Sequence, residues 1–417
     1  MENKKFLPII LGSDENAYGN ARLFVEQYNI RPLLICTARL IPTLNSRLFD
    51  IIEIKGFNSD EIFRCELLKI LKEKKEIYEN IVVVPCSDYY THLLSKYASD
   101  FEEYINNKFV KYELLSKLDT KDEFYRLCDK YGIDYPKTMI VSPEERETAL
   151  DNSDFSYPIV VKPENSNATE YLKCKFEGKK KVFFFDTIEE YDTIIKNMKS
   201  SGYFGKLIIQ EFIPGGDDSM RVVNTYSGND GKTRVASLGQ PVLEEYSPSS
   251  LGNYAAIISR SDEELCKKVA SFLDELGYVG FANFDMKYDS RSGKYMAFEI
   301  NCRPGRSSFY VRGAGLNLMA AMVEDAVFGK VQEELVCTDK TALWTAVPRI
   351  VLKKYVKNKA LKKEILSLWK KKALSRTLFC REDMSLKRMI RINRYFYSYC
   401  KNYAKYYFDK EKEQQPK

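Results

Sequence analysis

The chain has 417 residues, 44% of them hydrophobic and 30% charged, which is typical of a soluble globular protein with two or three domains. No apolar run is long enough to span a bilayer and the N-terminal apolar segment is too short for a secretion signal, so we expect a cytoplasmic protein. Ten scattered cysteines without a CxxC pair fit a reducing compartment, and the one histidine, His92, excludes a histidine-based triad or a multi-histidine metal site.

Short apolar strands alternate with helices at the start of the chain. Strands are predicted at 6–11, 32–37, 51–54 and 81–85, an alternation that is typical of a small parallel α/β domain. Polar residues follow the strand ends, among them Asp14, Arg39 and Asp88. They either line a small-molecule pocket or serve as turn residues and helix caps, and the pattern leaves both open. For His92, in a predicted helix, a partly buried helix residue is the simpler interpretation.

The next segment combines a helical pattern with lysine-bearing strands. The helix is predicted at 108–133 and ends at Gly132. Strands are predicted at 158–163, 171–176 and 181–185, and the first is apolar except for Lys162, whose amine needs an anionic partner or a route to solvent. The polar turn at 164–170 is suited to folding over phosphate groups through backbone N–H groups and nearby lysines.

A second lobe is predicted to begin with an apolar strand from Lys206 that ends at Pro214 and Gly215, after a helix at 187–201. Backbone groups just past such a strand suit the edge of a purine. The carboxylates of Asp217 and Asp218 are placed to accept hydrogen bonds from ribose hydroxyls. Strands at 220–224 and 234–238 and helices at 262–276 and 313–326 follow.

Two alternating runs around a polar turn predict a β-hairpin over 281–309. With the turn centred near Ser292, Asp285 lies across from Glu299, and Asn301 shares their face. Facing carboxylates repel unless a cation lies between them, and these oxygens suit Mg²⁺. Arg303 adds a forked donor for a phosphate oxygen. The alternative is an ordinary exposed hairpin with scattered charges.

The C-terminal part is strongly basic. Residues 351–417 hold 20 Lys/Arg and 6 Asp/Glu, a net charge of +14, whereas the preceding 350 residues carry a net charge of −8. Helices are predicted at 353–372 and 386–408, and the second interleaves basic and aromatic residues. Such a helix either contacts an anionic membrane surface or packs its aromatic side on the body, and we favour packing. No RNA-binding signature accompanies it, so we expect no nucleic-acid partner.

Five spaced motifs, carried by Lys121, VVKP, QEFIPG, FDMKYD and FEINCRPG, resemble the ATP-grasp superfamily of carboxylate–amine ligases. LGSDENAYGNAR, LGNYAAI and EINCRPGRSSF look more specifically like the D-aspartate ligase family. The resemblance spans nearly the whole chain. It implies an α/β ATP-grasp fold with a Rossmann-like pre-ATP-grasp domain (1–107), an ATP-grasp domain (108–330, with lobes 108–200 and 201–330) and a helical C-terminal extension (331–417).

The resemblance also implies a role for individual residues. ATP would be bound by Lys121, Lys162, Ser166, Gln210, Glu211, Phe212, Ile213 and Asp218. Mg²⁺ would be held by Asp285, Glu299 and Asn301. Arg303 and Lys162 would stabilise the transferred phosphate, and Arg306 would meet the acidic substrate. The sequence departs from many relatives in the glycine-free loop NSNATE and in the aspartate at position 285.

The implied reaction is an ATP-dependent ligation. The side-chain carboxylate of D-aspartate becomes an acyl phosphate and is then joined to the lysine ε-amine of the peptidoglycan precursor UDP-MurNAc-pentapeptide. Phosphoryl transfer of this kind needs positioning and charge neutralisation more than a protein nucleophile, in keeping with a chain that has one histidine. The alternatives are a ligase for another carboxylate and amine, and a nucleotide-binding protein without catalysis.

Overall fold

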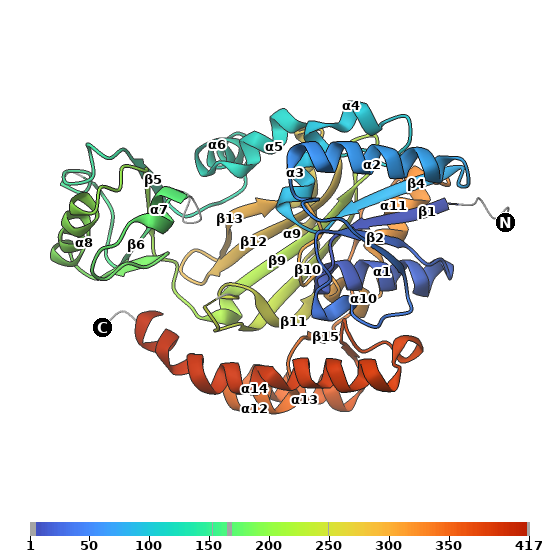
Figure 1. Cartoon of the computed structure of the whole chain (residues 1–417). Coiled ribbons are helices and arrows are strands. Elements are labelled where there is room, and N and C mark those ends of the chain that lie inside the picture. The colour runs from blue at the N-terminus through green and yellow to red at the C-terminus, as the bar shows by residue number, and fades with distance from the viewer. Residues whose placement is uncertain (1–5, 152, 165–168, 249, 415–417) are drawn as a thin grey trace.

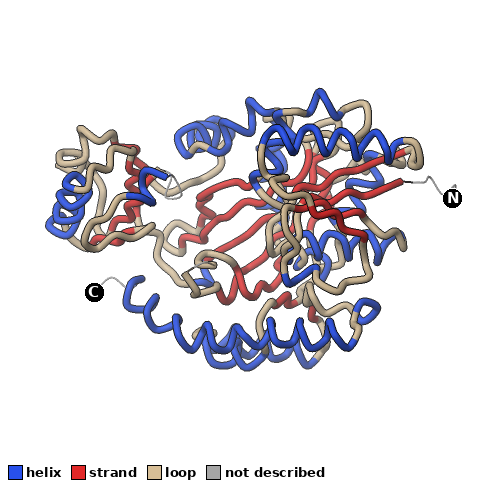
Figure 2. Tube along the Cα trace, viewed as in Figure 1, coloured by secondary structure: helices blue, strands red, loops and turns tan. Residues whose placement is uncertain are grey.

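The computed structural model describes residues 6–414 except 152, 165–168 and 249, with side chains as far as Tyr407, and these residues form three β-sheets (Figures 1 and 2). The largest sheet runs through the middle of the molecule. A parallel sheet lies on its N-terminal side, and a small lobe stands apart on the other side (Figure 1, left). The predicted α/β architecture is confirmed.

The N-terminal sheet is parallel, in the order β3-β2-β1-β4. Its strands are β1 (Phe6–Leu11), β2 (Leu33–Cys36), β3 (Asp50–Glu53) and β4 (Asn80–Pro85), and the helices around it are α1 (Glu15–Tyr28), α2 (Asp60–Lys75), α3 (Asp88–Lys96) and α4 (Ala98–Phe101). β1 and β4 are buried throughout, as expected of strands covered on both faces. Asp14 and Ser87 cap α1 and α3, so helix capping accounts for part of the polar strand-end pattern. A short turn of helix, η1 (Ile41–Thr43), follows β2.

The helical pattern at 108–133 is two helices, α5 (Tyr112–Asp119) and α6 (Lys121–Tyr131), and α6 ends at Gly132 as predicted. The small lobe then combines β5 (Thr138–Val141), β6 (Ile159–Pro163), β7 (Phe183–Phe185) and β8 (Leu207–Glu211), in the order β5-β8-β6-β7, with α7 (Thr169–Lys173) and α8 (Ile188–Ser200).

The strand predicted at 171–176 is wrong, because α7 occupies its first residues. Tyr171 is the one fully buried residue of this run, and its ring lies 5.1 Å from that of Tyr203 and 6.4 Å from that of Phe176. Cys174 and Phe176 are partly buried against the same cluster. Leu172 stays exposed. With one fully buried residue, this run does not need the alternating contacts that a strand supplies, and it forms a helix instead.

The central sheet has the strand order β13-β12-β9-β10-β11-β15-β16, with β14 beside β10. Its strands are β9 (Met220–Ser227), β10 (Thr233–Glu244), β11 (Tyr254–Arg260), β12 (Gly280–Asp289), β13 (Lys294–Asn301), β14 (Val336–Cys337), β15 (Leu343–Thr345) and β16 (Leu374–Ser375), and α9 (Glu263–Glu275), α10 (Tyr310–Gly313) and α11 (Leu318–Ala326) lie against it. β11 follows the turn-rich run at 249–254 and was not predicted. Residues beyond 330 thus contribute strands to this sheet, while the division of the chain at 107 and 330 stays a prediction.

The basic C-terminal part contains α12 (Arg349–Tyr355), α13 (Lys359–Lys370) and the long α14 (Leu386–Gln414), which lies along one side of the molecule (Figure 1, red). One side of α14 is buried against the body through Ile392, Phe396, Tyr399, Tyr403 and Tyr407. The predicted packing of its aromatic side is confirmed. None of the described helices is long and apolar enough to cross a membrane.

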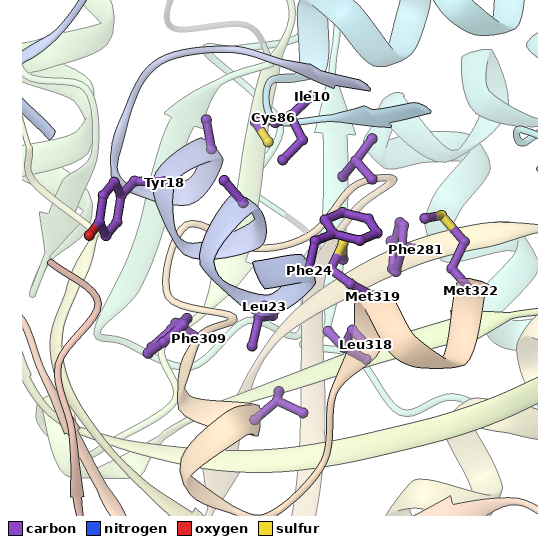
Figure 3. Close-up of a cluster of buried hydrophobic side chains, with 14 of the residues drawn as sticks. Ile10, Tyr18, Leu23, Phe24, Cys86, Phe281, Phe309, Leu318, Met319 and Met322 are labelled. Atoms are coloured by element: carbon purple, nitrogen blue, oxygen red, sulfur yellow. The ribbon is translucent and has the colours of Figure 1, made fainter. Parts of the chain in front are cut away.

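One hydrophobic cluster joins the N-terminal sheet to the central sheet (Figure 3). Tyr18, Leu23 and Phe24 from α1 lie with Leu318 and Met319 from α11, and all five are buried. The loops at the carboxyl ends of β1 and β4 are therefore held against the loop that follows β13. This packing places the polar strand-end residues of the N-terminal sheet beside the predicted metal-binding hairpin.

Candidate active site

The hairpin β12–β13 forms the centre of the candidate site, and Asp285 pairs with Glu299 in the predicted register. Tyr254 donates to one oxygen of Asp285 at 2.9 Å, and Asn301 and Asn283 donate to the other at 3.0 and 3.3 Å. Burial and the facing Glu299 raise the pKa of Asp285. A carboxylate in this position is therefore costly without a neighbouring positive charge.

Lys121 supplies one such charge from the first turn of α6. Its Nζ lies 2.9 Å from Glu299 Oε2 and 2.7 Å from the backbone oxygen of Phe298. This lysine lowers the pKa of Glu299. Gln210 on β8 joins the same network, because its amide donates to Tyr125 Oη at 2.9 Å and Tyr125 donates to Phe298. Lys121 and Gln210 thus connect the hairpin to α6 and to the small lobe.

The side-chain amine of Lys162, at the end of β6, makes no hydrogen bond or ion pair with any other described residue. Burial and the nearby charge of Lys121 lower the pKa of its amine to about 8, against a weaker attraction from Glu299. A half-buried amine without a partner indicates a site for an anion. Ser166, the other residue predicted in this loop, lies outside the described residues.

Arg303 follows β13 and faces the N-terminal sheet. Its Nε lies 2.6 Å from Asp88 at the start of α3, and one of its terminal nitrogens donates to Asn301 Oδ1 at 3.3 Å. His92, on the same helix, pairs with Asp119 and takes no part in this cluster. The sequence did not predict that Asp88 would meet Arg303, because the two are far apart in the chain.

Arg306 lies in a second, more buried polar group. It pairs with Glu245 at 2.8 Å, and Tyr399 on α14 approaches the same carboxylate at 3.5 Å. Glu15, 4% exposed at the start of α1, belongs to this group: burial raises its pKa to about 7, although Arg306 opposes the shift. The sequence pattern does not mark Glu15 as a functional residue, since an acid in the first turn of a helix is explained by its favourable interaction with the helix dipole.

A cavity of about 570 Å³ lies between the connection after β8 and the C-terminal helices. Phe212 and Asp218, predicted to contact adenine and ribose, line it, and Asn358 from the C-terminal part donates to Asp218 at 3.0 Å. Lys287 extends over the Phe212 ring at 5.4 Å. Ile213 is buried, and the backbone of Glu211 pairs with Lys137 at 3.0 Å. The cavity is large enough for a nucleoside.

The donor set of the hairpin suits a hard divalent cation. Among the described residues no group of three His, Cys, Asp or Glu side chains could hold a metal ion, so the amide oxygen of Asn301 has to join Asp285 and Glu299. Facing carboxylates, one with a raised pKa, are the arrangement that a cation relieves. Two carboxylates and an amide leave positions for water and phosphate, as Mg²⁺ prefers.

Three solved structures are similar to this chain in fold. The biotin carboxylase domain of Hydrogenobacter thermophilus 2-oxoglutarate carboxylase, with ADP and magnesium bound, has a TM-score of 0.59 at 13% identity, covering 82% of this chain and 74% of that one. N5-carboxyaminoimidazole ribonucleotide synthetase, as its ADP complex, has a TM-score of 0.57 at 18% identity, with coverage of 82% and 81%. L-amino acid ligase from Bacillus licheniformis has a TM-score of 0.53 at 16% identity, with coverage of 82% and 80%.

These structures share the ATP-grasp fold, and the chain is an ATP-grasp enzyme that ligates a carboxylate to an amine with ATP. Its sequence is 38% identical, over 422 aligned residues, to D-aspartate ligase from Enterococcus faecium, covering 99% of each chain. The chain belongs to the D-aspartate ligase family. No protein-family model matches the sequence.

Proposed function

We propose that the enzyme activates the side-chain carboxylate of D-aspartate with ATP and joins it to the lysine ε-amine of UDP-MurNAc-pentapeptide. The end-to-end similarity to a D-aspartate ligase supports the amino acid. The observation that carries the chemistry is the unpartnered, half-buried amine of Lys162 beside the facing carboxylates of the hairpin. An acceptor linked to a nucleotide places the reaction in the cytoplasm.

In this proposal ATP binds between the small lobe and the central sheet. The adenosine part occupies the cavity at Phe212, with Asp218 accepting from the ribose hydroxyls and the backbone from Gln210 to Ile213 at the purine edge. Lys121 and Lys162 then meet the phosphates, since both amines lie on the hairpin side of the small lobe. Lys162 gains most from this contact, because a phosphate supplies the charge that no described residue provides.

Asp285, Glu299 and Asn301 would hold Mg²⁺. An ion held there would supply positive charge to offset the negative charge of the phosphates and of the transferred phosphoryl group. The side chain of Asp285 is fixed by Tyr254 and two asparagines. The amide nitrogen of Asn301 faces Asp285 and its oxygen accepts from Arg303, so ligation by that oxygen would require the amide to rotate. Glu299 is held in its ionised form by Lys121.

The remaining residues act on the reacting groups. A carboxylate oxygen of aspartate attacks the γ-phosphorus and ADP leaves, giving an acyl phosphate; the amine then attacks the carbonyl carbon and phosphate leaves. Arg303 is aimed by Asp88 and stabilises the negative charge that develops on the transferred group. Arg306, fixed by Glu245, binds the acidic substrate.

The amine must lose a proton, and Glu15 suits this role. Its pKa of about 7 lies near neutrality, where a proton acceptor is most effective. Two other carboxylates of the site with raised pKa values are Asp285 and Glu245. Asp285 is committed to the metal set, and Glu245 is held by Arg306, so Glu15 is the better candidate.

A phosphate-release screen tests this function. Purified enzyme is given ATP, Mg²⁺ and UDP-MurNAc-pentapeptide with each D- and L-amino acid in turn, and Glu299→Gln serves as the inactive control. We expect phosphate release that needs both D-aspartate and the lysine acceptor. Phosphate release with another amino acid would show that this amino acid, and not D-aspartate, is the substrate. ATP binding without phosphate release under every condition would show that the protein binds nucleotide without catalysing ligation.

A further inference from the structure

A groove of about 510 Å³ lies between η1 and the N-terminal half of α14, outside the site described above. Its lining combines three cationic side chains with an apolar floor and contains no acidic residue. The lining residues are Ile41, Lys387, Ile390, Arg391, Arg394, Tyr395 and Ser398. The three cations lie on one face of the helix, because their spacing of four and three residues is that of successive helical turns.

These cations are not neutralised within the described part of the chain. Arg391 donates to the neutral side chain of Asn45, and neither Lys387 nor Arg394 has an ion pair with a described carboxylate. Asp383, four residues before Lys387, is buried and is bound by Arg388 instead. The groove therefore presents uncompensated positive charge to an incoming anion.

The wall of the groove is fixed. Arg388, fully buried next to Lys387 on α14, donates to the backbone oxygens of Pro42 and Leu44 at 3.0 and 2.9 Å. Its guanidinium also lies over the Tyr18 ring at 4.5 Å and pairs with Asp383 at 2.8 Å. The two sides of the groove are thus held together before a ligand arrives, which lowers the cost of binding.

A chain of side-chain contacts connects the groove to Arg306. Tyr395, in its lining, lies 3.4 Å from Tyr399 Oη, and Tyr399 approaches the Glu245 carboxylate that binds Arg306. A second connection runs through the loops after the parallel strands, where Ser13 donates to Ala38 O at 2.6 Å. Ligands of parallel α/β sheets bind at this edge, so the groove extends the site.

We propose that this groove binds the diphosphate of the acceptor. The inference rests on the proposed function, in which the acceptor is UDP-MurNAc-pentapeptide. In this acceptor the reacting lysine is far from a doubly charged diphosphate, so the diphosphate offers a second contact by which the protein can hold the acceptor. Forked guanidinium groups suit phosphate oxygens, and a concave, preformed wall suits one compact anion better than an extended surface does. The diphosphate is either that of a UDP-linked or that of a lipid-linked precursor.

Two matched triple variants test the proposal. The first is Lys387→Gln, Arg391→Gln and Arg394→Gln; the control is Lys359→Gln, Lys363→Gln and Lys370→Gln on α13, with the same loss of charge and a helix-compatible side chain. We expect the groove variant to raise KM for UDP-MurNAc-pentapeptide about tenfold or more, since each lost charged hydrogen bond weakens binding by roughly that factor. KM for ATP and for the nucleotide-free lysine peptide should not change.

Direct binding separates this proposal from the proposed function. Calorimetry with UDP-MurNAc-pentapeptide, while a non-hydrolysable ATP analogue occupies the nucleotide site, should show weaker binding to the groove variant alone. If the wild type binds the acceptor but does not turn it over, the proposed ligase function is refuted while the proposal of a diphosphate site in the groove is retained. Equal affinity of the wild type and the groove variant for UDP-MurNAc-pentapeptide would refute the proposal that the groove binds the diphosphate. Comparison with the lipid-linked precursor assigns the source of the diphosphate, and loss of anionic-vesicle binding with unchanged acceptor KM would make the groove a membrane contact instead.

Discussion

The buried carboxyl group of Glu15 predicts a pH dependence of stability that one substitution removes. The side chain is 4% exposed, and burial raises its pKa from 4.5 to about 7. The folded state therefore holds the proton more tightly than the unfolded state. Stability from this group is fully present below about pH 4.5 and is lost as the pH rises through about 7. Glu15→Gln keeps the shape of the side chain but cannot ionise.

The size of the effect follows from the pKa difference. A tenfold change in proton affinity corresponds to about 1.4 kcal/mol, so a pKa change from 4.5 to about 7 corresponds to about 3 kcal/mol. We expect the free energy of unfolding of Glu15→Gln, relative to wild type, to rise by about 3 kcal/mol between about pH 4.5 and about pH 8. Asp14 and Glu245, whose pKa values burial also raises, remain in both proteins, and their repulsion of the Glu15 charge is part of the measured difference.

Urea denaturation at several pH values measures this difference. The matched control is Asp289→Asn, which also replaces a buried carboxylate by its amide. Arg291 lowers the pKa of Asp289, so the stability from that pair is lost only at pH values below 3.8. The control should lose a constant amount of stability over the measured range. Parallel pH profiles for Glu15→Gln and wild type would refute the reasoning.

Two further predictions concern the reaction and the C-terminal helix. Arg303→Ala and Glu299→Gln should each lower kcat by ~10²–10³, because the first removes the positive charge that stabilises the transferred phosphate and the second removes a charged ligand of the metal site. Arg312 pairs with Glu26 outside the site, so Arg312→Ala should leave kcat unchanged. Near-normal turnover of both site variants would contradict the role of the hairpin. Ile392→Ala, at a fully buried position of α14, should cost about 2–5 kcal/mol in the free energy of unfolding, and the exposed Met389→Ala on the same helix less than about 0.5 kcal/mol. A small loss at Ile392 would show that α14 contributes little to the core.

The hairpin was predictable because its information is local. Alternation sets which residues share a face, and the turn sets the register, so Asp285 and Glu299 could be paired from the sequence. The parallel N-terminal sheet was predictable for a similar reason, since its strands alternate with amphipathic helices. The helix at 169–173 was not predictable, because a short run with one fully buried residue shows neither the helical nor the strand periodicity of hydrophobic residues.

The second polar group could not be predicted, because it is assembled from distant parts of the chain. Glu15, Glu245 and Arg306 meet only after the N-terminal sheet packs against the central sheet, and Tyr399 arrives from α14. No local pattern marks such residues, since each fits an ordinary helix or strand end. The strands β15 and β16 were missed because two or three residues are too few to show alternation.

The order of strands in the central sheet has a consequence for synthesis on the ribosome. The outer side of β11 is covered only when β15 and then β16 arrive, and these come some 80 or more residues later in the chain. Until then the segment YAAIISR offers unpaired backbone groups and aliphatic side chains to any neighbouring extended chain. A product truncated before Leu343 should accumulate as insoluble aggregate, and chaperone demand should peak while this stretch is emerging.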